Sequence, residues 1–99
     1  MMVRPASFAH NLQTAATNRF QKGPARAANL TRLAQMQFDA AVHRLTGAQI
    51  RVCVIDDTPT PPKPDALFPN NWISFHRDGT VVFYPMLAPN RRWERRPEN

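Results

Sequence analysis

The 99 residues of this chain are enough for one small domain and too few for two. An apolar content of 42% allows a core, and a formal charge of +6 is high for this length, which favours phosphate or other anionic partners. The single cysteine, Cys53, excludes an intrachain disulfide and a four-cysteine zinc site.

The sequence predicts neither a membrane span nor a secretory signal. No apolar run approaches the length of about 20 residues that spans a bilayer, and residues 1–11 lack the apolar core of a signal peptide. A lone cysteine fits a reducing compartment. We therefore expect a cytoplasmic protein.

The N-terminal part predicts a short strand and then a polar segment. Residues 2–4 fit a strand, which Pro5 would end or place at a sheet edge because proline has no N–H for the ladder. Residues 8–23 are mostly polar between the aromatic anchors Phe8 and Phe20. We expect a long loop there, with some helical character.

A long helix is predicted next. Pro24 suits its first turn, where a missing N–H costs nothing, and Gly47 is the expected C-terminal stop. Apolar residues recur at spacings of three and four, which is typical of a helix of about 20 residues with one buried apolar stripe. The stripe consists of Leu30, Ala34, Phe38, Ala41, Val42 and Leu45.

Alternation of side chains over residues 49–55 predicts a strand with at least one well-buried face. Cys53 lies in the middle of this strand among β-branched residues, so we expect a buried structural thiol rather than a nucleophile. Residues 56–64 hold four prolines in nine positions, which excludes helix and sheet and favours a stiff extended loop that leads to Asp65.

A hairpin and a short helix are predicted at the C-terminal end. Apolar residues 72–75 and 81–84 flank an Asp-Gly pair, a strong hairpin signal because glycine accepts the positive φ of the turn. Asn90 is a plausible N-cap for a helix that begins at Arg91. The arginines of residues 91–96 are typical of a solvated helix face or a frayed tail.

This order of elements predicts an α/β fold. A helix between two strands permits a parallel pair, and the hairpin would add antiparallel strands to give one mixed layer. Asp65, Asn70 and Asn71 then lie at the entry to the hairpin, where α/β folds place ligand groups. Two interpretations of these residues stay open: a turn device, or a pocket that binds a planar, nitrogen-rich group through hydrogen bonds to its edges.

Five segments in this order resemble the N-terminal part of the arginine-deiminase-related, amidinotransferase-like enzymes. The nearest subgroup is the citrulline utilization hydrolases, also called citrulline ureidases, and dimethylarginine dimethylaminohydrolase is similar more distantly. The resemblance covers nearly all 99 residues. The segments are MVRPASF (2–8), FDAAVHRL (38–45), PDALFPNNW (64–72), DGTVVFYPM (78–86) and NRRWERR (90–96).

The resemblance implies a partial pentein fold, an α/β-propeller built of ββαβ-type modules, of which residues 1–99 would form about one module and the start of the next. It also implies that a cysteine thiolate attacks the central carbon of a guanidino or ureido group while a histidine acts as general acid and base. No metal or organic cofactor is implied.

The resemblance also implies substrate-binding residues. Asp65 matches the acid that holds the terminal nitrogens of the substrate, and Arg91 matches an arginine that binds its α-carboxylate. Asn70 and Asn71 stand where the guanidine-cleaving relatives have acids. Amides donate and accept hydrogen bonds, so the change favours a neutral ureido group, such as that of citrulline, over a guanidinium.

The resemblance assigns no catalytic residue in this chain. The family's cysteine and histidine belong to regions that match nothing here, so we expect an N-terminal fragment of a C–N hydrolase that is inactive by itself. A ureido or guanidino amino acid would be the partner, without nucleic acid or membrane, and sheet edges left exposed would favour self-association. Two alternatives remain: a small basic protein that binds nucleic acid through its arginines, and an inactive truncated product.

Overall fold

The computed structural model describes residues 1–19 and 29–96. Three-residue strands, two α-helices and two 3₁₀ helices alternate along this part of the chain. None of its helices combines the length and the apolar character that crossing a bilayer requires. In chain order the elements are β1 (Met2–Arg4), α1 (Leu12–Ala15), α2 (Leu30–Gly47), β2 (Val54–Asp56), η1 (Pro69–Asn71), β3 (Ile73–Phe75), β4 (Val81–Phe83) and η2 (Pro89–Glu94).

The strands of the described residues form two separate two-stranded sheets. β1 and β2 are parallel, with Met2 opposite Val54, as the intervening helix predicts. β3 and β4 are antiparallel, with Ile73 opposite Phe83. The expected single mixed layer is therefore wrong, because the proline-rich loop after β2 lacks ladder donors and carries the chain away before the hairpin forms. The α/β content itself is as predicted.

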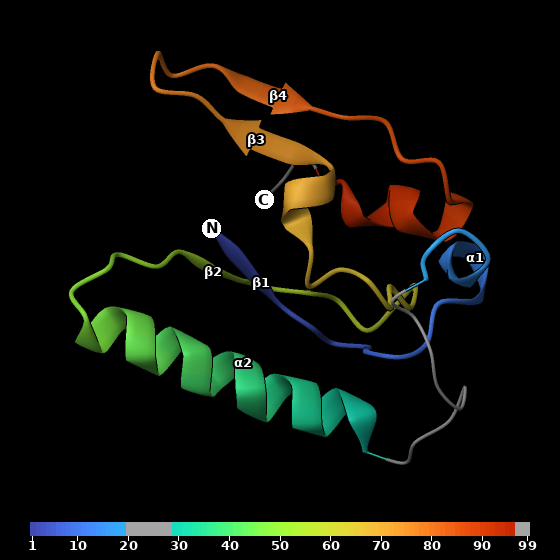
Figure 1. Ribbon diagram of the computed structural model, residues 1–99, viewed down its shortest axis with the longest axis horizontal. Helices are drawn as coiled ribbons and strands as arrows, with labels where there is room; N and C mark the ends of the chain where they lie inside the picture. The colour runs from blue at the N-terminus through green and yellow to red at the C-terminus, as the bar shows by residue number, and fades with distance from the viewer. Residues whose placement is uncertain (20–28, 97–99) are drawn as a thin grey trace.

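Helix α2 covers one side of the β1–β2 pair, and the β3–β4 hairpin lies on the other (Figure 1). The apolar stripe of the helix is confirmed, because Phe38 is buried together with Val3 of β1. Its expected start at Pro24 lies outside the described residues. The helix does end at Gly47, but the left-handed residue that follows is Gln49, with φ of 61°.

Strand β2 is shorter than predicted, and Cys53 is exposed rather than buried. The register explains both differences. Met2 pairs with Val54 and is the first residue of β1, so in the described residues the parallel ladder has no partner for the segment before Val54. The Met2 N–H donates to the Cys53 carbonyl at 2.8 Å, but the Cys53 side chain is left in solvent.

The hairpin forms as predicted. Gly79 has φ of 87° at its turn, and the Asp78 carboxylate accepts from the Thr80 N–H at 2.9 Å. Trp72, directly before β3, is buried and stacks on Phe83 of β4 with ring centroids 6.2 Å apart. The hairpin is thus anchored to the core through its entry.

The C-terminal helix differs from its prediction in type and start. η2 is a 3₁₀ helix that begins at Pro89, and Asn90 lies inside it instead of capping an α-helix at Arg91. Proline suits the first helical position because it has no N–H to satisfy. The Asn90 side chain is engaged elsewhere, since its Nδ2 donates to Asn11 Oδ1 at 2.8 Å.

Candidate functional site

A buried polar cluster forms where three distant segments meet. One segment is α1 with its N-cap, the second is the end of the proline-rich loop, and the third is η2, which lies beside α1 in Figure 1. The segments that follow β1 and β2 lead to α1 and to Asp65, so the cluster gathers beyond the carboxyl ends of the parallel strands, where open α/β sheets place ligands. We call Asn11, Thr14, Asp65, Asn90, Arg91 and Glu94 the Asp65 cluster.

Asp65 is the centre of this cluster and is only 5% exposed. Its Oδ2 accepts from Asn11 Nδ2 at 2.7 Å and from Thr14 Oγ1 at 3.3 Å. The same oxygen lies 3.8 Å from Arg91 Nε. A buried carboxylate is tolerated because hydrogen bonds and a cation compensate for its lost hydration.

Arg91 is held between two carboxylates. Its Nε and Nη2 donate to the two oxygens of Glu94 at 2.9 and 2.8 Å, a bidentate pair. A 3₁₀ helix repeats every three residues, so Arg91 and Glu94 lie on the same buried ridge of η2. The expectation of a solvated arginine face is therefore wrong for Arg91, although Arg92 and Arg95 are exposed.

Amide side chains join α1 to η2. Asn11 caps α1 by accepting from the Gln13 N–H at 3.1 Å, and the same oxygen accepts from Asn90 Nδ2 at 2.8 Å. Gln13 Oε1 in turn accepts from the Asn90 N–H at 2.9 Å. These bonds fix Asn11 so that its amide N–H points at Asp65.

A second buried ion pair supports the loop that carries Asp65. Lys63 Nζ lies 3.1 Å from Asp57 Oδ1 and donates to the carbonyls of Thr58 and Pro61 at 2.8 and 2.9 Å. It also reaches the Thr58 hydroxyl at 2.8 Å. The ammonium therefore folds residues 57–63 around itself and fixes the path of the chain into Asp65.

Glu94 is only 4% exposed. Burial raises the pKa of Glu94; Arg91 opposes that rise, and the charges of Asp65 and Asp57 add to it. The surroundings of Glu94 therefore favour its protonated form more than water does.

The structure brings together two of the four predicted substrate-binding residues. Asp65 and Arg91 meet in the cluster, whereas Asn70 and Asn71 are exposed on η1. Within the described residues, neither amide side chain hydrogen-bonds to Asp65 or Arg91.

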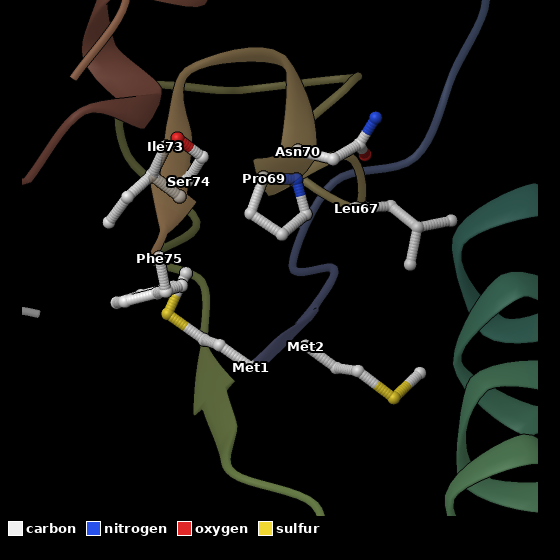
Figure 2. Close-up of a pocket in the computed structure, with 8 residues that line it drawn as sticks. All are labelled: Met1, Met2, Leu67, Pro69, Asn70, Ile73, Ser74 and Phe75. Atoms are coloured by element: carbon white, nitrogen blue, oxygen red, sulfur yellow. The ribbon is translucent and has the colours of Figure 1, made fainter. Parts of the chain in front are cut away.

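Asn70 lines a different pocket, of about 430 Å³. Figure 2 shows apolar side chains, among them Met1, Pro69 and Phe75, around this pocket, with the Asn70 amide turned away from Met1 and Phe75. The pocket is therefore mainly apolar where Asn70 borders it.

Sequence reasoning missed Asn11, Lys63 and Glu94. A signal for Glu94 was present, since it stands three residues after Arg91, the spacing of one 3₁₀ turn. Asn11 and Lys63 gave no such signal, because their partners depend on how distant segments converge. Cys53 lies before β2 and Asp57 after it, so the strand separates this thiol from the Asp65 cluster.

Comparison with known proteins shows the family. No curated protein and no solved structure gave a significant match. A family model described as "N,N dimethylarginine dimethylhydrolase, eukaryotic" matches residues 4–99. That name describes hydrolysis of a C–N bond in a guanidino compound. The match spans nearly the whole sequence. The chain therefore belongs to this family of C–N hydrolases, which is part of the pentein superfamily.

Proposed function

We propose that this chain provides part of the substrate-binding side of a hydrolase that cleaves a C–N bond in a ureido or guanidino amino acid, with a citrulline-like compound preferred. The observation that carries the proposal is the buried Asp65–Arg91 pair, 3.8 Å apart, in a member of a C–N hydrolase family. A carboxylate complements an N–H-rich head group, and a guanidinium complements the α-carboxylate of the same amino acid.

In this proposal Asp65 accepts hydrogen bonds from the head group, and Arg91 binds the α-carboxylate. Glu94 now fills one fork of the Arg91 guanidinium with two short hydrogen bonds. Because a guanidinium has five N–H donors in a rigid plane, a substrate carboxylate can bind the remaining edge or replace Glu94. Protonation of Glu94, which its raised pKa favours, would assist the exchange.

The preference for a ureido group rests on Asn70 and Asn71. Both are exposed on η1, and in the described residues neither side chain makes a hydrogen bond, so both are available to a ligand. Amides can donate to a ureido carbonyl and accept from its N–H groups, whereas a guanidinium cation gains more from carboxylates.

The chemistry itself would come from groups outside these 99 residues. In the proposed reaction a cysteine thiolate adds to the central carbon, a histidine protonates the departing amine, and water then releases the product and restores the thiol. Cys53 does not fit this role because β2 separates it from Asp65. His43 and His76 are exposed on α2 and on the hairpin.

We propose further that residues 1–99 are one part of a pentein fan. Both strand pairs leave apolar side chains exposed, including Val54, Phe75 and Val81. Surfaces of this kind fit contact with further modules or with a second copy.

The test of substrate choice is Asn71→Asp, with binding of citrulline, arginine and N,N-dimethylarginine measured by titration calorimetry. We expect the original chain to prefer citrulline, and the variant to shift the citrulline-to-arginine affinity ratio about tenfold towards arginine, because a charge-assisted hydrogen bond replaces a neutral one. Asn29→Asp, which makes the same charge change at an exposed residue before α2, is the control.

Two results would contradict the proposal. One is an unchanged affinity ratio in Asn71→Asp. The other is a preference of the original chain for either guanidinium compound over citrulline, which would remove the basis for assigning Asn70 and Asn71 to a neutral head group.

A further inference from the structure

A second cavity, of about 380 Å³, lies between β4 and the C-terminal part of η2 with the residues that follow it. Its lining consists of Phe83 from β4 and the arginines 92, 95 and 96. The three-residue repeat of a 3₁₀ helix explains the arrangement, because Arg92 and Arg95 share one ridge while Arg91 and Glu94 share another. The two sites therefore use different side chains of η2 and of the two residues that follow it.

Neutral groups hold two of these arginines in place. Arg92 donates through Nε to the Met86 carbonyl at 3.1 Å and through Nη2 to the Leu87 carbonyl at 3.3 Å. Arg96 Nη2 donates to the Asp56 carbonyl at 2.9 Å. The carbonyl oxygens of Met86 and Leu87 orient the Arg92 guanidinium without cancelling its charge. Within residues 1–19 and 29–96, neither Arg92 nor Arg95 forms an ion pair.

Phe83 supplies a fixed aromatic surface in the same cavity. Its ring stacks on Trp72 with an interplanar angle of 10°, and Trp72 is only 2% exposed. Phe83 itself is 51% exposed, so the buried indole supports a ring that is still open to a ligand. Offset stacking of a planar group on such a ring is favourable and tolerates many ring types.

We propose that this cavity binds a small molecule that combines phosphate groups with a planar ring, as a nucleotide does. Arginine forks match phosphate oxygens geometrically, and Arg92 and Arg95, which form no ion pair among the described residues, carry charge that attracts an anion. The cavity volume falls within the range of small-molecule sites. Phosphates would lie against the arginines 92, 95 and 96 while the ring stacks on Phe83.

The test is titration calorimetry of the purified chain with ATP, inorganic tripolyphosphate and adenosine. ATP should bind more tightly than either of the other two. The double variant Arg92→Ala/Arg95→Ala should weaken ATP binding about tenfold or more. The control Arg32→Ala/Arg44→Ala removes the same charge from exposed positions on α2 and should leave the affinity for ATP nearly unchanged.

Phe83→Leu separates ring recognition from charge. It should lower the affinity for ATP to that for tripolyphosphate while tripolyphosphate binding stays the same, which also shows that the variant is folded. The proposal is overturned if ATP does not bind, if ATP binds no better than tripolyphosphate, or if both double variants lose affinity equally. Binding of a single-stranded oligonucleotide without binding of ATP would also overturn it.

Discussion

Lys63 shows how one buried side chain can determine the path of a loop. Its ammonium is surrounded by the Asp57 carboxylate and by oxygens of Thr58 and Pro61, and the lysine is 1% exposed. A buried ammonium with this many partners lowers the stability of the fold little, but removing it leaves the Asp57 carboxylate buried without its cation. Its role here is to position Asp65, two residues further on.

Lys63→Met keeps most of the side-chain volume and removes the charge. We expect it to lower the free energy of unfolding by about 3–5 kcal/mol, because the Asp57 carboxylate is left buried and unpaired. Denaturant unfolding followed by the fluorescence of buried Trp72 measures this loss. Arg4→Met, which breaks the exposed Arg4–Asp39 pair, is the matched control and should have a much smaller effect. Equal losses of unfolding free energy in the two variants would show that the buried pair stabilises the fold no more than the exposed pair does.

Cys53 shows what alternation cannot predict at the residue scale. A side chain in an alternating segment is buried only if a neighbouring strand or helix covers it. Here the ladder starts at Met2 and Val54, so Cys53 stays exposed. The family resemblance pointed to Asp65 and Arg91, which lie 3.8 Å apart in the structure. The contact of Asp65 with Asn11 joins residues 54 positions apart and has no local signal.

At the scale of elements, turn chemistry was predictable and helix type was not. The Asp-Gly pair predicted the hairpin because the positive φ that the turn requires is set by the glycine itself. The stripe of α2 was also predictable, because its period is a property of the segment itself. η2 is instead a 3₁₀ helix that starts at Pro89, and its residues Asn90 and Arg91 contact Asn11 and Asp65, which are distant in the sequence.

Two glycines test this local account. Gly79 has φ of 87°, and Gly47 ends α2 without a positive φ; an added Cβ meets no atom within 4 Å at either position. Gly79→Ala should therefore lower the free energy of unfolding by about 1–2 kcal/mol through backbone strain. Gly47→Ala should instead raise it, by up to about 1 kcal/mol, because alanine favours the helix.

Thermal unfolding of both glycine variants measures these changes. The two substitutions have the same chemistry, so their opposite signs isolate the backbone conformation. A neutral or stabilising Gly79→Ala would show that the turn is not held in the positive-φ conformation.

At the scale of the whole molecule, the site forms because three segments that are distant in the sequence meet in the fold. The segments around Asn11, Asp65 and Arg91 are far apart in the sequence and meet beyond the ends of β1 and β2. The order of elements predicted a parallel pair and a hairpin, but not which loops would close over the strand ends. The family match covers residues 4–99 and so includes all three of these segments.

The most direct test of the central claim is an NMR titration of the ¹⁵N-labelled chain that follows the Arg91 Nε–H and Asn11 Nδ2–H₂ resonances. Citrulline should shift both resonances saturably, because in the proposed function its ureido group would bind beside Asp65 and its carboxylate would bind Arg91. N-butylurea, which lacks the carboxylate, should shift only the Asn11 resonance. Unchanged resonances of Asn11 and Arg91 at saturating citrulline would contradict the account.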